Sequence, residues 1–269
     1  MSLNKIRAFI KRDFSIEVSY RLSFFLRLAR ILVTVLIFYF ISKLFGKGAS
    51  EHLQEYGGEY FPFVLIGIAF SGYLMFGLRS FSESIRQEQM MGTLEAVLVT
   101  PTRVSIIVIG ASIWNFVFSS ITVFIYLLLG VVLFGVDLSS MNLVSGVIIL
   151  ILTILSFSSI GIISAAFVIM LKKGDPLTWF MGTCFSFLGG VYFPVDIMPK
   201  FLQVFSSLLP ITYSLRSLRL ALLKGYGLNM LLPDIVPLFI FCVLLMPISI
   251  GLFKLALKKA RIDGSLVHY

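Results

Sequence analysis

The sequence predicts an all-α polytopic membrane protein with six transmembrane helices. Apolar residues make up 58% of the 269 residues and charged residues only 13%. The mean hydropathy of +1.01 is far above that of a soluble globular chain. The charges stand in short islands, and the uncharged runs between them are long enough to cross a bilayer core of about 30 Å. Little sequence is left for a water-exposed catalytic domain.

The chain begins with an amphipathic pattern. From Leu3 to Phe25, apolar residues recur every three or four positions, and Lys5 and Arg12 fall on the opposite face. This spacing predicts a helix at the membrane interface over residues 1–27, followed by a six-span domain over residues 28–269. Simple membrane anchoring explains the pattern as well as a contact with a partner does.

Charge-free runs predict the six crossings. The first run is short because Arg30 and Lys43 bound it, so their side chains must snorkel to the interface. The third and fourth runs are long, and a tight turn near Asp137 separates them, which predicts a helical hairpin. The expected spans are about residues 28–45, 61–81, 104–135, 138–171, 176–193 and 233–255.

The distribution of Lys and Arg predicts the orientation. Six crossings put both termini on the same side, and if that side is cytoplasmic the inner segments hold sixteen Lys and Arg against six in the outer segments. We therefore expect a multi-pass protein of the cell (plasma) membrane with both termini cytoplasmic. The net charge of +9 has the same cause, so it indicates no nucleic-acid partner.

Spans three to five, and the sixth span between Ile235 and Phe253, contain no Asp, Glu, Lys, Arg or His. A proton-driven transporter generally needs a titratable group near the membrane midplane, so this mechanism is disfavoured. Sodium coupling through broken helices stays open but has no positive support. The sequence also lacks the motifs of an intramembrane enzyme and the phosphate-binding loop of an ATPase. We expect no catalytic residue, no metal and no cofactor in this chain, and an energy source outside it or none at all.

Two further segments have distinctive patterns. Between spans two and three, residues 83–101 predict a short cytoplasmic helix, because Gly92 marks a break and an apolar stripe follows until a proline. An ordinary loop helix resting on headgroups explains this pattern too. After span five, residues 194–210 carry prolines too closely spaced for a crossing helix but remain apolar. They predict a re-entrant segment on the outer side, with a flat surface helix as the alternative. Arg216 and Arg219 are then expected near the outer headgroups.

Small and polar residues predict how the spans pack. Gly161 and Ala165 are four residues apart, which favours close helix approach. A polar stripe on the third span predicts hydrogen bonds across the long hairpin, and it consists of Ser112, Asn115, Ser119 and Thr122.

Two blocks resemble the permeases of the ATP-binding-cassette (ABC) type-2 transporter family. The first is Glu88-x-x-x-Gly92-Thr93-Leu94-Glu95 followed by Thr100-Pro101, and the second comprises residues 190–199, Leu209-Pro210-Ile211-Thr212-Tyr213 and Leu218-Arg219. The resemblance covers the whole chain in order and span count. It implies that the first block is a coupling helix touching a nucleotide-binding ATPase subunit, and that the segment at residues 1–27 is a connecting helix.

The resemblance also implies partners and site residues. ATP and Mg would bind in the separate ATPase subunit, and a second permease copy (a homodimer) or a paralogue would complete the pore. The contact with the ATPase subunit would consist of Glu88, Met91, Gly92, Thr93, Leu94 and Glu95. The translocation path along the dimer seam would be lined by Phe70, Tyr73, Phe76, Phe185, Phe187, Val191, Tyr192, Phe193 and Pro194.

The leading hypothesis is the permease subunit of an ATP-driven exporter for a hydrophobic or amphiphilic substrate, such as a drug, a lipid, a natural product or a lipid-linked glycan. The rival is an uncoupled membrane protein such as a lipid scramblase or an assembly scaffold. A lipid-modifying enzyme is opposed by the missing paired acids and metal ligands. Copurification of an ATPase subunit distinguishes the first two hypotheses.

Overall fold

The computed structural model describes residues 21–45, 51–90, 104–171 and 176–262, and these ranges contain helices but no strands. The all-α class is therefore confirmed for the described chain. Eight of its elements are α-helices and two are short 3-10 helices. In chain order they are α2 (Arg21–Phe45), η2 (Glu51–Tyr56), α3 (Tyr60–Met90), α5 (Val104–Phe134), α6 (Leu143–Leu171), α7 (Pro176–Leu188), η3 (Val195–Ile197), α8 (Lys200–Ser207), α9 (Pro210–Leu223) and α10 (Leu232–Ile262).

Five described helices are long and apolar enough to cross a membrane, namely α2, α3, α5, α6 and α10. The fifth expected crossing corresponds to α7, which has 13 residues and is about 20 Å long. This length is below the bilayer core of about 30 Å, so the structure does not confirm six spans. Of the expected interface helix, residues 1–20 lie outside the described ranges. α2 is already helical at Arg21 and continues without a break into the expected first span.

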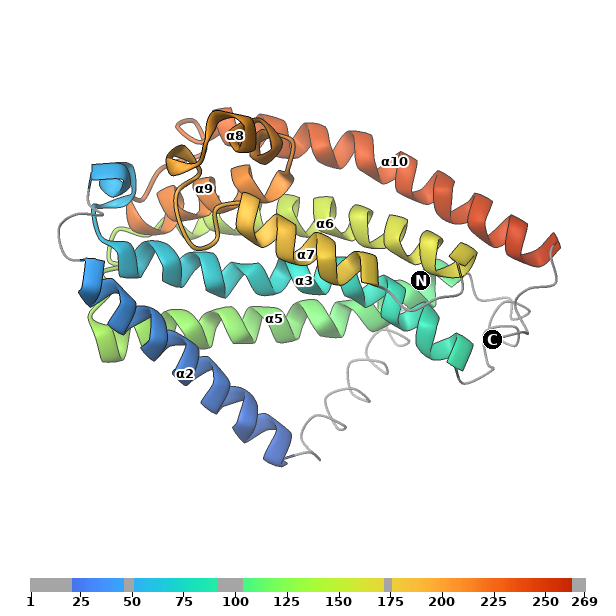
Figure 1. Ribbon diagram of the computed structural model, residues 1–269, viewed down its shortest axis with the longest axis horizontal. Coiled ribbons are helices and arrows are strands. Elements are labelled where there is room, and N and C mark those ends of the chain that lie inside the picture. Colours follow the sequence, from blue (N-terminus) through green and yellow to red (C-terminus); the bar gives the residue numbers. More distant parts are fainter. Residues whose placement is uncertain (1–20, 46–50, 91–103, 172–175, 263–269) are drawn as a thin grey trace.

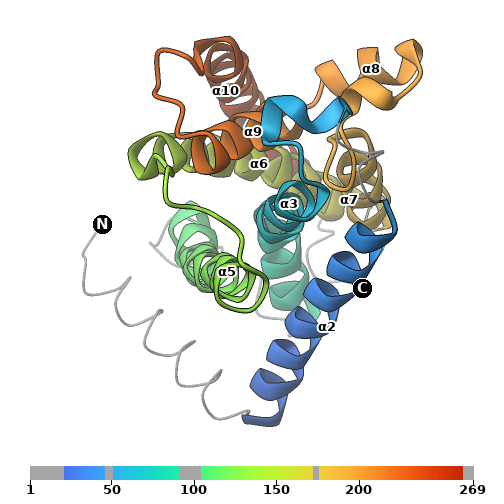
Figure 2. The same ribbon diagram turned by 90° about the vertical axis from the view of Figure 1, so that its left-hand side faces the viewer.

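α3 is the central helix of the bundle (Figures 1 and 2). It packs against α5 on one side, against α6 and α9 on another, and against α2 and α7. Its apolar stretch is 61% buried, whereas the corresponding stretch of α2 is only 11% buried. The outer helices therefore expose long rows of apolar side chains, which a bilayer covers and water would not tolerate.

The bundle has two distinct ends. α3, α6 and α10 all finish at one end, which we call the C-terminal end. The opposite end, the loop end, carries η2, the turn between α5 and α6, and the chain that follows α7 (Figure 1). There, α9 runs back along α6, α10 and the first turns of α3. The short helices η3, α8 and α9 occupy the region where the sequence predicts re-entrant structure, but their depth in a membrane stays a prediction.

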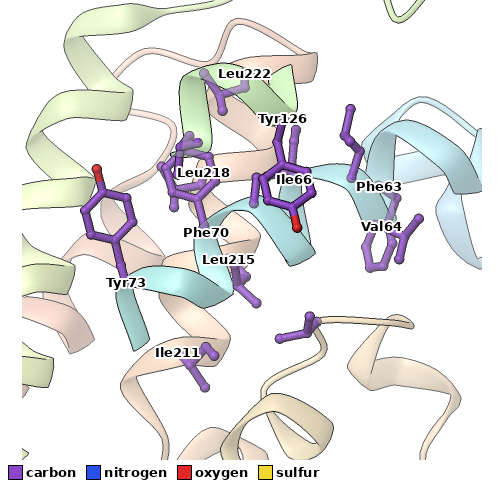
Figure 3. Close-up of a cluster of buried hydrophobic side chains, with 14 of the residues drawn as sticks. Phe63, Val64, Ile66, Phe70, Tyr73, Tyr126, Ile211, Leu215, Leu218 and Leu222 are labelled. Carbon is purple, nitrogen blue, oxygen red and sulfur yellow. The ribbon is translucent and has the colours of Figure 1, made fainter. Parts of the chain in front are cut away.

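The core lies around α3, where α5, α6 and α9 pack against it. The close-up in Figure 3 shows side chains from α3, α5 and α9 pointing into one cluster, among them Ile66 and Phe70 of α3, Tyr126 of α5 and Leu218 of α9. In a lipid environment, hydrophobic burial gives little net attraction between helices. Close packing and hydrogen bonds must therefore hold this core together.

Small residues and hydroxyl groups make the helix contacts specific. A Cβ atom built on Gly161 of α6 would lie 1.9 Å from the carbonyl oxygen of Gly77 on α3, so these backbones touch, as the small residues predict. Thr153 and Ser214 join α6 to α9 by a hydrogen bond of 2.5 Å. The predicted polar stripe on α5 is wrong in detail. Within the described residues, Ser119 has no partner and Thr122 bonds to its own helix.

Ser120 of α5 bonds instead to α3, which is not part of the predicted hairpin: its hydroxyl lies 2.6 Å from that of Tyr73. The stripe missed this contact because α5 turns Ser120, and not Ser119, toward the tyrosine. The side chains of Ser112 and Asn115 lie outside the described residues.

Candidate translocation and coupling site

A buried arginine joins three segments at the loop end. Arg219 of α9 is 3% exposed. Its Nε donates a hydrogen bond of 3.0 Å to the carbonyl oxygen of Phe63 in the first turn of α3. Its Nη2 donates another of 3.0 Å to the carbonyl oxygen of Val191, which follows α7. The guanidinium also lies 3.5 Å from the centre of the Phe63 ring. We call Phe63, Gly67, Val191 and Arg219 the Arg219 junction.

Gly67 makes this junction possible. A Cβ atom at this position would lie 2.1 Å from the carbonyl oxygen of Val191 and 2.5 Å from Nη2 of Arg219. Both distances are far below ordinary van der Waals contact, so only glycine lets the chain after α7 approach α3 this closely. Val191 directly follows Gly190, which has a φ of +75° and forms a turn. The backbone of this turn thus aims a carbonyl oxygen at the arginine.

Burial lowers the pKa of Arg219 to about 9, and the nearby Tyr56 partly counteracts this effect. The side chain is therefore still a cation at neutral pH. A cation removed from water is costly unless its donors are satisfied. Two backbone carbonyls and the face of an aromatic ring supply that compensation here. The described chain places no carboxylate within salt-bridge distance of Arg219.

Arg216, one turn earlier on α9, makes a more exposed set of contacts. Its Nη2 lies 2.8 Å from Oε1 of Glu55 on η2, and its Nη1 lies 3.7 Å from Oδ1 of Asp234 at the start of α10. The hydrogen bond with Glu55 raises the pKa of Arg216, and Asp234 adds to the effect. Because Arg216 and Glu55 are both open to solvent, their pair contributes at most about 1 kcal/mol. It orients η2 more than it stabilises the fold.

Aromatic side chains surround the turn between α7 and η3. Tyr192 is 40% exposed and stacks on Phe38 of α2, with ring centres 5.8 Å apart. Phe187, near the end of α7, meets Phe193 edge to face at 5.3 Å. The structure thus gathers three of the residues predicted for the translocation path at one place, next to α2.

The other predicted path residues are differently placed. Phe70 and Tyr73 are buried inside the chain and stack on each other along α3, and Val191 and Pro194 are also buried. Phe76 and Phe185 are partly buried. The predicted set therefore divides into an exposed group around the turn and an inner group that packs within one chain. Whether either group contacts a substrate stays a prediction.

Comparison with known proteins identifies the family. The sequence matches the model of the ABC-2 type transporter family over residues 4–223. The chain belongs to the ABC-2 type transporter family. It is 24% identical over 201 residues to the inner membrane transport permease YadH of Escherichia coli (strain K12), covering 73% of this chain and 75% of that protein. The matches to YadH of Escherichia coli O157:H7 and of Shigella flexneri have the same values.

Membership in the family confirms the resemblance seen in the two sequence blocks. The family implies a membrane subunit with a transport function, and its permeases generally work with an ATPase partner. The relatives named above are inner membrane permeases, and the five apolar helices of the present permease agree with a membrane location.

The coupling block of the permease lies mostly outside the described residues. Glu88 is in the last turn of α3, but its side chain is not described, and residues 91–95 (Met91, Gly92, Thr93, Leu94 and Glu95) fall outside the described ranges. The position of Glu88 is informative nevertheless. The apolar stretch of α3 ends at Arg79, so Glu88 lies about 13 Å further along the same helix. α3 thus carries the start of the coupling segment beyond its apolar part without a break.

Sequence reasoning misplaced the central residue of the junction. Arg219 was expected near the outer headgroups, but it is buried in the protein. A signal for this was present, because Leu215 and Leu222 lie four positions before and three after it on the same helix face, and both are buried. An arginine in the middle of an apolar face must find partners inside the fold. Gly67 and Ser71 are four residues apart, a spacing that favours close helix packing, but the approach of the Val191 carbonyl to Gly67 had no sequence signal, since it depends on two distant segments.

Proposed function

We propose that this chain is the permease subunit of an ATP-driven exporter for hydrophobic or amphiphilic substrates. A separate ATPase subunit binds ATP and Mg, and a second permease copy or a paralogue completes the translocation path. The observation that carries the proposal is the family match over residues 4–223, together with the absence of Asp, Glu, Lys, Arg and His from spans three to five and from residues 235–253 of the sixth. A permease without a proton-binding group at the midplane is poorly suited to proton coupling, which favours energy from a partner.

Force enters through α3 in this proposal. α3 is the most buried of the five apolar helices, and it continues as one helix from the core to Glu88. A push on its C-terminal end is therefore transmitted directly to the bundle core, since a continuous helix is stiff along its axis. Glu88 and Glu95 would pair with basic residues of the ATPase subunit, and Met91 to Leu94 would fill a groove beside them. This arrangement puts both termini in the cytoplasm, consistent with the Lys and Arg distribution.

Cargo moves along the seam between two permease copies in this proposal. The aromatic group of Phe187, Tyr192 and Phe193, of which the first two are exposed, supports a hydrophobic or amphiphilic cargo, because aromatic faces bind both hydrocarbon chains and rings. Phe70 and Tyr73 would act behind this surface as its rigid support. The Arg219 junction attaches the turn that contains Tyr192 to α3, and α3 is the helix that the ATPase subunit moves in this proposal. It thereby links the two ends of the bundle mechanically.

A charge-reversal experiment tests the coupling. The double variant Glu88→Lys, Glu95→Lys is purified with the ATPase subunit and reconstituted in liposomes, and ATP hydrolysis and transport of an amphiphilic dye are measured. We expect normal insertion but loss of permease-stimulated ATP hydrolysis and of transport. The control is Glu59→Lys, which reverses an exposed charge at the loop end and should leave both activities unchanged.

Two results would contradict the proposal. Unchanged dye transport and ATP hydrolysis in the double variant would remove the coupling role of this segment. Failure to copurify with any ATPase subunit, with lipid or dye movement by the permease alone, would instead favour the scramblase hypothesis.

A further inference from the structure

An apolar groove with a basic rim lies between α6 and α10, near the C-terminal end of the bundle. Its volume is about 480 Å³, within the range of about 300–1,000 Å³ that holds small ligands. Figure 1 shows α6 and α10 running in the same direction, and the two helices pack along one another. The residues that line the groove include Ala166, Phe167 and Met170 of α6 and Leu255, Lys258 and Lys259 of α10.

The groove results from the small residues at this helix contact. Ala166 of α6 and Ala256 of α10 are almost completely buried and belong to one apolar cluster, and such small side chains let helices approach closely. Ala166 lines the groove, whereas its neighbours Phe167 and Met170 are long and about half exposed. A short side chain flanked by long ones leaves a hollow between the helices. The hollow is lined by hydrocarbon from both sides.

Two lysines give the groove a charged end. Lys258 and Lys259 lie at least six residues beyond Leu252, which also lines the groove, and this separation is about 9 Å along the helix. Both lysines are exposed, and neither forms a salt bridge with any residue in the described part of the chain. A ligand that matches this arrangement has an anionic group at one end and hydrocarbon beside it.

We propose that the groove is a binding site for one anionic phospholipid. Its phosphate contacts Lys258 and Lys259, and one acyl chain lies against Phe167, Met170 and Leu255. Charge complementarity and the apolar lining select this occupant. The exposed side chains beside the groove face the bilayer, so a lipid reaches the site laterally. Lysines at the end of a membrane helix also snorkel to headgroups where there is no site, but snorkelling alone would not depend on the shape of Ala166.

Native mass spectrometry of the full-length permease, released from detergent, tests the site. The protein is incubated with an equimolar mixture of phosphatidylglycerol and phosphatidylcholine, and the retained lipids are counted. We expect one tightly retained phosphatidylglycerol. Since each lysine near an anionic headgroup contributes about a factor of five, Lys258→Gln, Lys259→Gln should reduce the preference for phosphatidylglycerol about 25-fold. Ala166→Phe should fill the groove and abolish retention of both lipids.

A charge-matched control separates the site from the general charge of the surface. Lys200→Gln, Lys254→Gln removes two other exposed lysines that do not line the groove and should retain phosphatidylglycerol as the wild type does. Equal loss in this control, or wild-type retention in Lys258→Gln, Lys259→Gln, would overturn the proposal. So would an Ala166→Phe variant that loses a second permease copy but keeps its lipid. The lipid count is independent of ATP hydrolysis, so it does not depend on the proposed function.

Discussion

Replacing Gly67 by alanine is the sharpest test of the Arg219 junction. The substitution adds one methyl group to α3, in the middle of its apolar stretch. That methyl group would lie 2.1 Å from the carbonyl oxygen of Val191 and 2.5 Å from Nη2 of Arg219. The control is Gly72→Ala on the same helix, where a Cβ atom would meet nothing within 4 Å in the described part of the chain beyond its own turn of helix. The two variants differ only in what surrounds the added methyl group.

The structure sets the size of the expected effect. Alanine favours a helix over glycine by about 1 kcal/mol at either position. At Gly67, relieving the overlap requires a shift of the Val191 backbone, and overpacking of this kind costs about 1–3 kcal/mol. Loss of the hydrogen bond from the buried guanidinium to Val191 costs about 1.5–3 kcal/mol more. The net destabilisation by Gly67→Ala is therefore about 1.5–5 kcal/mol, whereas Gly72→Ala should be neutral or slightly stabilising.

Thermal unfolding in detergent, followed by circular dichroism at one heating rate, measures the difference. At about 2–4 °C per kcal/mol for a chain near this size, Gly67→Ala should unfold at least about 3 °C below the wild type. In an Arg219→Met background, Gly67→Ala should lower the unfolding temperature by less than it does in the wild type, because the two residues share one contact. If Gly67→Ala unfolds at or above the temperature of Gly72→Ala, the close approach of the three segments does not exist.

Two further predictions concern single side chains. Tyr73→Phe and Ser120→Ala should each lower the free energy of unfolding by about 0.5–1.5 kcal/mol. Their double variant should cost less than the sum, because both remove the same 2.6 Å hydrogen bond, and strictly additive losses would contradict that bond. Burial in η2 and the neighbouring Glu55 raise the pKa of Tyr56 from 10.0 to about 12. The wild type and Tyr56→Phe are titrated with base, and the difference between their tyrosinate absorbances reports Tyr56 alone. This difference should therefore appear near pH 12 in the folded permease, and its appearance near pH 10 would show that Tyr56 is solvated. The folded state holds this proton longer than the unfolded state, so Tyr56 itself weakens the fold as pH rises from 10 to 12.

The helices could be predicted because membrane spans are encoded locally. The long charge-free runs became α5 and α6, whose boundaries lie within five residues of those expected, and the sixth became α10, which continues seven residues beyond the expected end. They are helical because a backbone in lipid must satisfy its own hydrogen bonds. α7 departs from the expected span of residues 176–193 because the helix ends at the Gly189-Gly190 pair, although apolar residues continue to Phe193. Composition along a run predicts that a helix forms, but it cannot fix where a turn of the chain cuts the helix short.

The candidate site was only partly predictable. Phe187, Tyr192 and Phe193 were singled out as path residues, and the structure brings them together beside α2. Phe70 was singled out on equal grounds, yet it packs inside the chain. Whether a ring is exposed or buried depends on which face of its helix turns toward the neighbouring helices. In a span that is apolar on all sides, the periodicity of the sequence does not show which face that is.

The sequence by itself determined that this chain is a helical membrane permease, because hydropathy, charge placement and two short blocks are properties of contiguous residues. Only the tertiary structure decided that Arg219 is buried, that Gly67 admits the Val191 carbonyl, and that Ala166 and Lys258 border one groove. These features join residues that are distant along the chain. In lipid, where hydrophobic burial does not favour one helix pairing over another, shape and hydrogen bonding choose the pairing, and both exist only once the helices have met.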